Sequence, residues 1–185
     1  MNPWLSILMP VYNVEPYLEE CFASILSQAL EGVEVIAVDD RSTDNSSSIL
    51  NNLKASAGVD IKLLQHVCNQ GVAPARNTLL GAATGDYLWV IDPDETLSQG
   101  AASCLKNIIA SHSPDLIMCD YKRWRPEADS QSARERINWP PLTVPQVFFM
   151  MIRNYFSRES MKREEFIHGQ KFQSEVCGIR SCVSL

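Results

Sequence analysis

Short apolar runs alternate with segments of helical periodicity along the first 120 residues, and this alternation strongly limits the fold. The apolar runs predict strands at residues 4–9, 33–38, 61–65, 87–91 and 115–119. Apolar residues at helical spacing predict helices between them, at residues 15–28, 46–57, 74–83 and 100–111. Regular alternation of this kind predicts an α/β fold with a mostly parallel central sheet flanked by helices.

Polar residues gather directly after the first four predicted strands. They occupy residues 10–13, 39–44, 69–71 with 76–77, and 92–94. In mostly parallel α/β sheets, ligands bind beyond the carboxyl ends of the strands. We therefore expect these clusters to meet at one edge of the sheet and to form a single site.

Asp92 and Asp94 form the most distinctive pair, one residue apart and directly after a predicted strand. Two carboxylates at this spacing can face one divalent cation, which takes oxygen ligands and shares its coordination with phosphates. Such a cation would neutralise a diphosphate leaving group. By themselves, the two residues could equally form a turn that caps the following helix.

The other clusters each allow a binding role and a plain structural role. Asp39 and Asp40 can accept hydrogen bonds from a nucleobase or a ribose hydroxyl, or they can cap the helix that begins near residue 46. Arg76 can bind a diphosphate with two hydrogen bonds, or it can form a surface ion pair. Tyr12 can stack on a base, or it can fill the core.

The composition argues against several classes of function. A net charge of −6 gives the 185-residue chain no general attraction for nucleic acid or an anionic membrane. Neither of two glycine-rich phosphate-binding motifs, G-x-x-x-x-G-K-[ST] and G-x-G-x-x-G, occurs. The six cysteines include no C-x-x-C pair, which argues against zinc and favours reduced thiols in the cytoplasm. The three histidines lack evident partners and are expected to be structural or exposed: His66, His112 and His168.

In this order, the clusters resemble the motifs of the family 2 glycosyltransferases. The matching text is L-M-P-V-Y-N at residues 8–13, V-D-D-R-S-T-D-N-S at 38–46, N-Q-G at 69–71, A-R-N at 75–77, A-T-G-D-Y-L at 83–88 and D-P-D at 92–94. The K-R-E-E-F stretch at 162–166 is a fainter match to a basic Arg-x-x-Phe stretch of that family. The resemblance is good to about residue 120.

The resemblance implies a nucleotide-diphospho-sugar transferase (Rossmann-like) architecture. Residues 1–121 would be the nucleotide-sugar-binding domain, and residues 122–185 an incomplete acceptor-side region. The implied reaction is inverting transfer of a sugar from a nucleotide-diphosphate sugar to an acceptor hydroxyl, in polysaccharide or lipopolysaccharide synthesis for the cell envelope. The implied cofactor is Mn²⁺ or Mg²⁺, and the implied partners are the sugar donor and a glycan or glycolipid acceptor.

The resemblance also assigns residues by position. The nucleotide-sugar site would comprise Pro10, Tyr12, Asn13, Glu15, Asp39, Asp40, Arg76 and Asp92. Among them, Pro10, Tyr12 and Asp40 would hold the nucleoside. Asp92 and Asp94 would form the D-x-D metal site.

Two departures from the family pattern stand out. Arg41 occupies a position where the family usually has glycine, and a residue with a side chain tolerates fewer backbone conformations. Inverting transfer also needs a carboxylate near the acceptor hydroxyl to take its proton. No Asp follows Asp129, and Glu175 is a candidate base that could equally be a surface charge. The catalytic base stays unassigned, and the alternative function is a truncated, inactive nucleotide-sugar-binding fragment.

The segment at residues 144–156 is unusually apolar, and we expect a helix there. It would either pack in the core or make peripheral contact with a membrane that carries a lipid-linked acceptor. No signal peptide and no run of 18 apolar residues occurs in the sequence. The expected location is therefore the cytoplasm, including the inner face of the membrane.

Overall fold

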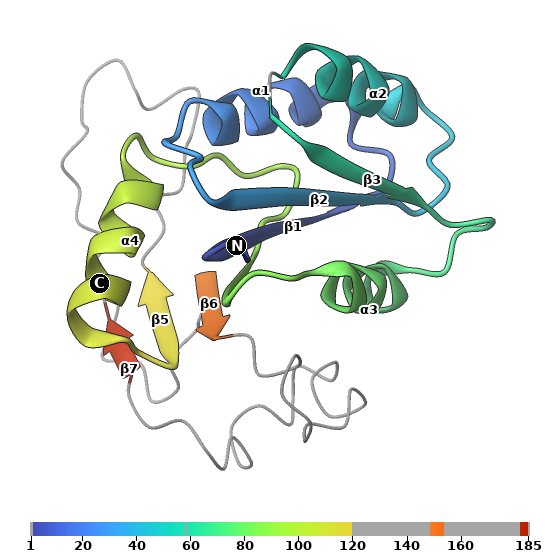
Figure 1. The fold of residues 1–185 in the computed structure, drawn as a ribbon. Coiled ribbons are helices and arrows are strands. Elements are labelled where there is room, and N and C mark those ends of the chain that lie inside the picture. Colours follow the sequence, from blue (N-terminus) through green and yellow to red (C-terminus); the bar gives the residue numbers. More distant parts are fainter. Residues whose placement is uncertain (1, 58, 120–148, 154–181, 185) are drawn as a thin grey trace, which may run out of the picture.

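Seven strands form one sheet in the order β3-β2-β1-β4-β6-β5-β7, in a computed structural model that describes residues 2–57, 59–119, 149–153 and 182–184 (Figure 1). The strands are β1 (Leu5–Val11), β2 (Val33–Asp39), β3 (Ile61–Gln65), β4 (Tyr87–Val90), β5 (Leu116–Cys119), β6 (Phe149–Arg153) and β7 (Cys182–Ser184). β1, β2, β3 and β4 pair in parallel, and β7 pairs in parallel with β5. The expected mostly parallel sheet is confirmed.

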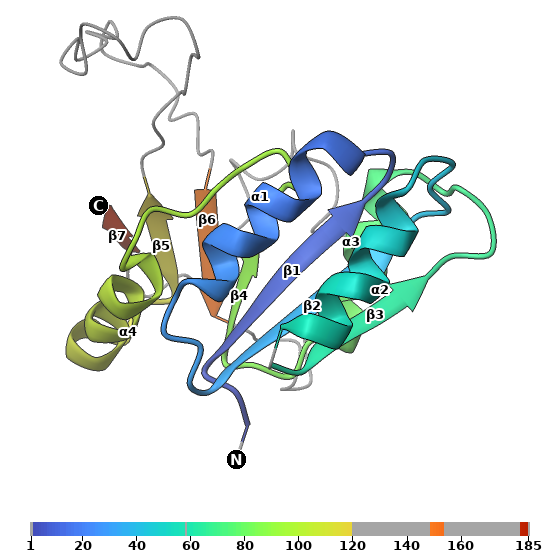
Figure 2. The same ribbon diagram turned by 90° about the horizontal axis from the view of Figure 1, so that it is seen from above.

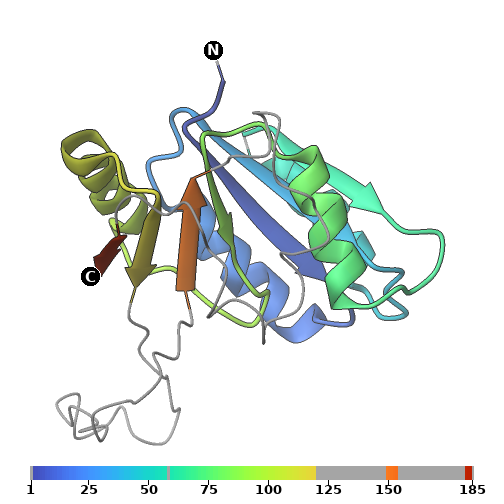
Figure 3. The ribbon, with the colours of Figure 1, turned by 90° about the horizontal axis from the view of Figure 1, so that it is seen from below.

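Helices cover both faces of this sheet. They are α1 (Glu15–Leu26), α2 (Ser46–Ser56), α3 (Val72–Ala82) and α4 (Ala101–His112). α1 and α2 lie on one face, as Figure 2 shows from above, and α3 lies on the opposite face, as Figure 3 shows from below. Among the described residues, no helix combines the length and the apolar character needed to cross a lipid bilayer.

The core has two parts because the central strands are buried on both faces. Ile7 of β1 packs in the part that includes α1, α2 and α4, whereas Leu8 packs with α3 on the other face. Both side chains are fully buried, and each contributes about 2 kcal/mol by its removal from water. This two-sided burial explains why β1 and β2 are apolar over nearly their whole length rather than at alternate positions.

The predicted helix at residues 144–156 is wrong over its described part. Residues 149–153 form strand β6, which pairs antiparallel with β4 on one side and with β5 on the other. A short, continuously apolar segment fits a buried strand as well as a buried helix, and its periodicity cannot separate them. The sheet therefore contains strands from both sides of residue 121, the expected boundary between the two functional parts.

Candidate functional site

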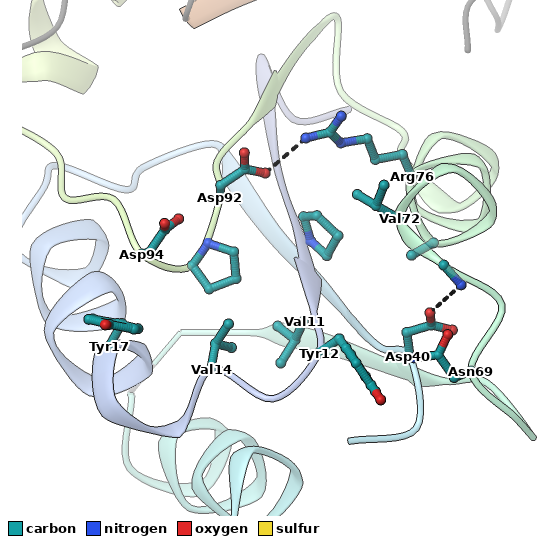
Figure 4. Close-up of a pocket in the computed structure, with 14 residues that line it drawn as sticks. Val11, Tyr12, Val14, Tyr17, Asp40, Asn69, Val72, Arg76, Asp92 and Asp94 are labelled. Atoms are coloured by element: carbon teal, nitrogen blue, oxygen red, sulfur yellow. Dashed lines mark hydrogen bonds and ion pairs between the residues drawn. The ribbon is translucent and has the colours of Figure 1, made fainter. Parts of the chain in front are cut away.

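A pocket of about 510 Å³ lies at the carboxyl edge of the parallel strands. It is lined by Pro10, Val11, Tyr12, Val14, Tyr17, Asp40, Asn69, Gly71, Val72, Ala75, Arg76, Asp92, Pro93 and Asp94. These residues come from the ends of β1, β2, β3 and β4 and from the starts of α1 and α3 (Figure 4). The expectation that the four polar clusters meet in one place is confirmed, and the volume is typical of a small-molecule site.

Six of the residues assigned from the sequence line this pocket. They are Pro10, Tyr12, Asp40, Arg76, Asp92 and Asp94. Tyr12 keeps 45% of its surface exposed, so it forms part of the pocket wall and is not core filler. Figure 4 places its ring on the same side of the pocket as Asp40 and Asn69. A flat aromatic face beside a carboxylate can stack on a base while the carboxylate accepts a hydrogen bond.

The other three assigned residues, Asn13, Glu15 and Asp39, do not line the pocket but tie its loops together. Oδ1 of Asn13 accepts a hydrogen bond from the backbone N–H of Thr43 at 2.8 Å. Because the N-cap residue of α1 is Val14, the side chain of Asn13 does not cap that helix. Its φ of 51° is left-handed, a conformation that asparagine tolerates better than most residues.

Glu15 and Asp44 hold the loop before α2 against the start of α1. The carboxylate of Glu15 accepts hydrogen bonds from the backbone N–H and the side-chain amide of Asn45. In return, Oδ2 of Asp44 accepts from the backbone N–H of Glu15 at 3.1 Å. Oδ1 of Asp44 accepts from the N–H of Ser46, so the carboxylate at the start of α2 is Asp44.

Asp39 and Asp40 are both buried but have different partners, and neither is bonded to the N-terminal backbone of α2. Oδ1 of Asp39 accepts from the N–H of Ser42, and its Oδ2 accepts from the side-chain amide of Gln65. The carboxylate of Asp40 instead reaches the N-terminus of α3, where it accepts from the N–H groups of Gln70 and Gly71. The alternative that this pair caps α2 is therefore wrong.

The Asp40 carboxylate also meets His66, a residue for which no partner was evident in the sequence. Nδ1 of His66 lies 2.6 Å from Oδ1 of Asp40. Burial by itself raises the pKa of Asp40, but the bonds from Gln70, His66 and Gly71 together hold that pKa below its ordinary value. Asp40 is therefore an ionised hydrogen-bond acceptor at neutral pH.

At the other end of the pocket, Arg76 of α3 pairs with Asp92, which follows β4. Nη2 of Arg76 lies 3.0 Å from Oδ1 of Asp92 (Figure 4). Nε of Arg76 is buried, and no hydrogen-bond partner for it is found among the described residues. The guanidinium thus has donor capacity left for an anionic ligand.

Three acidic side chains gather after β4: Asp92, Asp94 and Glu95. Within the described chain, the carboxylate of Asp94 receives no hydrogen bond, and that of Asp92 receives only the one from Arg76. The pKa of Glu95 is raised to about 7, first by burial and then by the negative charges of Asp92 and Asp94. Glu95 follows the D-x-D text directly, so its place beside the pair was visible in the sequence although it was not singled out.

This donor set fits a hard divalent cation. Oxygen atoms of one or two carboxylates, completed by water and phosphate oxygens, are what Mg²⁺ takes in proteins. No group of three or more His, Cys, Asp or Glu side chains arranged for one metal occurs in the described part of the chain. The protein's share of such a site would accordingly be the two carboxylates of Asp92 and Asp94.

Arg41 has a φ of 65°, in the left-handed region that favours glycine. This is the position at which the family 2 glycosyltransferases usually have glycine, as noted from the sequence. The late acidic residues Glu164, Glu165 and Glu175 and the stretch at 162–166 lie outside the described residues.

Comparisons with known proteins show which family and which folds the chain resembles. A sequence model described as "Glycosyl transferase family 2" matches residues 6–180. An uncharacterized glycosyltransferase of Bacillus subtilis, EpsJ, is 34% identical over 141 residues. That match covers 76% of this chain but 38% of the relative, so the chain spans well under half of the relative's length.

Two solved structures share the fold and part of the sequence. Staphylococcus aureus TarS, solved in complex with UDP-GlcNAc, matches with a TM-score of 0.61 and 27% identity, over 68% of this chain and 37% of that one. A mannosyltransferase of Pyrobaculum calidifontis, solved with GDP-Man and Mn²⁺, matches with a TM-score of 0.59 and 25% identity, over 66% of this chain and 36% of that one.

Proposed function

The chain belongs to glycosyl transferase family 2, and on that basis we propose that it takes part in inverting transfer of a sugar from a nucleotide-diphosphate sugar to an acceptor hydroxyl. The proposal rests on the observation that one pocket is lined by Tyr12 and Asp40 at one end and by Arg76, Asp92 and Asp94 at the other. The acceptor would be a glycan or glycolipid in polysaccharide or lipopolysaccharide synthesis, at the cytoplasmic side of the membrane. Residues 1–121 would bind the donor, and residues 122–185 would contribute to the acceptor side.

The end of the pocket near β1 and β2 would hold the nucleoside. Pro10 and Tyr12 offer apolar contact to a base, and the ionised carboxylate of Asp40 offers an acceptor for an N–H or a hydroxyl. Asn13, Glu15 and Asp39 would act indirectly, because their hydrogen bonds fix the two loops that carry Tyr12 and Asp40. A fixed loop loses less conformational entropy when the ligand binds.

The end near α3 and β4 would hold the diphosphate. Arg76 can donate two parallel hydrogen bonds to phosphate oxygens. Asp92 and Asp94 would hold Mn²⁺ or Mg²⁺ through carboxylate oxygens, as their chemistry permits. When bound, the cation supplies neutralisation of the charge that develops on the diphosphate leaving group. The residue that takes the proton from the acceptor hydroxyl is not assigned among the described residues.

Thermal denaturation with a panel of nucleoside diphosphates, with and without Mn²⁺, tests the proposal. A ligand that binds only the folded chain stabilises it by about 2.7 kcal/mol at one hundred times its Kd. We expect at least one diphosphate to raise the melting temperature only when Mn²⁺ is present. Asp94→Asn should remove that dependence. Asp60→Asn, which changes an exposed acidic residue before β3 at the far edge of the sheet, should retain it.

Two results would decide against parts of the proposal. If no diphosphate shifts the melting temperature in any metal, the donor site is wrong. If the chain binds a diphosphate but forms no product from nucleotide sugars and candidate acceptors, it supports the alternative of a binding fragment without turnover. Product formation that Asp94→Asn abolishes would support the enzyme.

A further inference from the structure

Three side chains from different elements form a hydrogen-bonded row behind the pocket wall: Thr78, His66 and Asp40. Oγ1 of Thr78 on α3 lies 2.9 Å from Nε2 of His66, which follows β3. Nδ1 of the same ring lies 2.6 Å from Oδ1 of Asp40, which follows β2. The side chains of His66 and Asp40 are 9% and 3% exposed. The row therefore connects helix α3 to the one carboxylate at the nucleoside end of the pocket.

The direction of the hydrogen bonds in this row follows from the chemistry of its members. An ionised carboxylate can only accept, so Nδ1 of His66 must carry the hydrogen. The hydroxyl of Thr78 can donate to a bare Nε2 or accept from a protonated one, so it pairs with the ring in either state. The ring is thereby held at both nitrogens, and its orientation is fixed.

The acceptor capacity of Asp40 is almost filled. An ionised carboxylate offers about four acceptor positions. Three donors already bind it: Nδ1 of His66, the N–H of Gly71 at 2.7 Å from Oδ2, and the N–H of Gln70, which is shared between Oδ1 at 3.0 Å and Oδ2 at 3.2 Å. With three donors bound, the carboxylate has capacity for about one more. Asp40 lines the pocket, where Figure 4 shows its carboxylate beside Asn69.

We propose that His66 is a positioning residue for the nucleoside of the donor: it locks the Asp40 carboxylate so that a single acceptor position faces the pocket. This inference rests on the proposed function, because it assumes that a nucleoside occupies that end. A ligand that places an N–H or O–H at this fixed acceptor binds more tightly, and a ligand that places a lone pair there binds more weakly. His66 therefore sets discrimination between nucleobases without touching the ligand.

Substitutions at the two ends of the row separate this role from simple stability. In His66→Asn the side-chain amide nitrogen sits on Cγ, as Nδ1 does, so it can still donate to Asp40. His66→Leu retains bulk but removes both bonds, and Thr78→Val removes only the hydroxyl bond to the ring. Tyr87→Phe is the matched control, because it removes a buried hydrogen bond from the Tyr87 hydroxyl to the carbonyl of Pro114, and neither residue lines the pocket.

The experiment is calorimetric titration of each variant with UDP, GDP, ADP and CDP in the presence of Mn²⁺, alongside its melting temperature. The readout is the ratio of the tightest to the weakest Kd. We expect His66→Leu to weaken the tightest diphosphate at least about tenfold and to shrink the ratio, because a buried charge loses one donor. In His66→Asn, the affinity for the tightest diphosphate and the ratio should both lie within about threefold of the unaltered chain. In Thr78→Val, the affinity and the ratio should fall by an intermediate amount. Tyr87→Phe should lower the melting temperature and leave the ratio unchanged.

The outcomes are distinguishable. If the unaltered chain binds none of the four diphosphates, the proposed function fails and the role of His66 fails with it. If the chain binds them but folded His66→Leu keeps its affinity and ratio, only the positioning role is overturned. If His66→Leu does not fold, the other two variants test the role. The role is refuted if the ratio of the tightest to the weakest Kd in Thr78→Val equals that of the unaltered chain. It is also refuted if folded His66→Asn loses this ratio.

Discussion

Nη2 of Arg76 on α3 donates to Oδ1 of Asp92, which follows β4, at 3.0 Å across the pocket. The two side chains are 43% and 45% exposed, so the ion pair is partly screened by solvent and is weak. It neutralises part of the charge on one of the two carboxylates that would hold a cation. On the proposed function, Arg76 and a divalent cation would therefore compete for Asp92 when no nucleotide is bound.

Replacement of Arg76 by glutamine should change metal binding and nucleotide binding in opposite directions. An exposed ion pair is worth up to about 1 kcal/mol, so its loss should tighten Mn²⁺ binding without nucleotide by up to about fivefold. The affinity for a nucleoside diphosphate with Mn²⁺ should fall, because a bidentate phosphate donor is lost. Electron paramagnetic resonance of free Mn²⁺ measures the first effect, and calorimetry the second. Weaker binding of Mn²⁺ alone in Arg76→Gln would contradict the competition.

Gly85→Ala should destabilise the fold, because β1 passes too close to Gly85 for a side chain. A Cβ atom there would lie 2.6 Å from Oγ of Ser6 and 2.7 Å from the Ser6 backbone nitrogen. We expect a loss of about 2 kcal/mol in the free energy of unfolding, measured by urea denaturation. Gly100→Ala is the control: nothing lies within 4 Å of its Cβ position, and its φ of +80° should cost only about 1 kcal/mol. Equal losses in the two variants would show that the contact with β1 is not the cause.

Arg41→Gly should stabilise the chain, because Arg41 is held at a φ of 65°. A residue with a side chain in the left-handed region destabilises the folded chain by about 1–2 kcal/mol, and glycine removes this cost. Glycine also has more freedom in the unfolded chain, which offsets part of the gain. The expected net gain is about 0.5–1 kcal/mol in urea denaturation. Asn13→Gly, at a φ of 51°, should instead lower stability, since it removes the acceptor for the N–H of Thr43. A loss of stability in Arg41→Gly would mean that its side chain makes a favourable contact.

Acid should destabilise the fold through Asp40 and Asp44. Burial by itself raises both pKa values, but hydrogen bonds from neighbouring residues hold each below the ordinary value of 3.8. A carboxyl group whose pKa is lower in the folded chain stabilises that state fully above its unfolded pKa. This contribution is lost as the pH falls through 3.8 toward the folded-state pKa. Urea denaturation between neutral pH and pH values below 3.8 should show the loss.

Asp44→Asn provides the check on this pH dependence. It removes one of the two carboxylates that titrate below their ordinary value, so stability should depend less on pH in the acid range than in the unaltered chain. Asp60→Asn, at an exposed position outside these networks, should retain the full slope. An unchanged slope in Asp44→Asn would refute the assignment of acid sensitivity to this loop.

Most of the fold could be predicted from local patterns. The strand at residues 61–65 was placed at its observed bounds, and the other predicted strands and helices of the first 120 residues differ from the structure by at most two residues at each end. These patterns reflect how often apolar residues recur along the chain, and this spacing can be read from each segment by itself. The segment at 149–153 was misassigned for the same reason. Its strand character comes from pairing with β4 and β5, which the segment itself does not encode.

The sequence by itself determined that polar loops follow four strands of a mostly parallel sheet, and hence that Asp40, Arg76, Asp92 and Asp94 share one edge. Only the tertiary structure decided what each residue does there. In the structure, Asp39 accepts a hydrogen bond from Gln65, and Asp40 bonds to His66 and to the start of α3. Arg76 forms an ion pair with Asp92. The physical reason is that strand order and burial choose the partners of a polar group, and those partners lie tens of residues away in the chain.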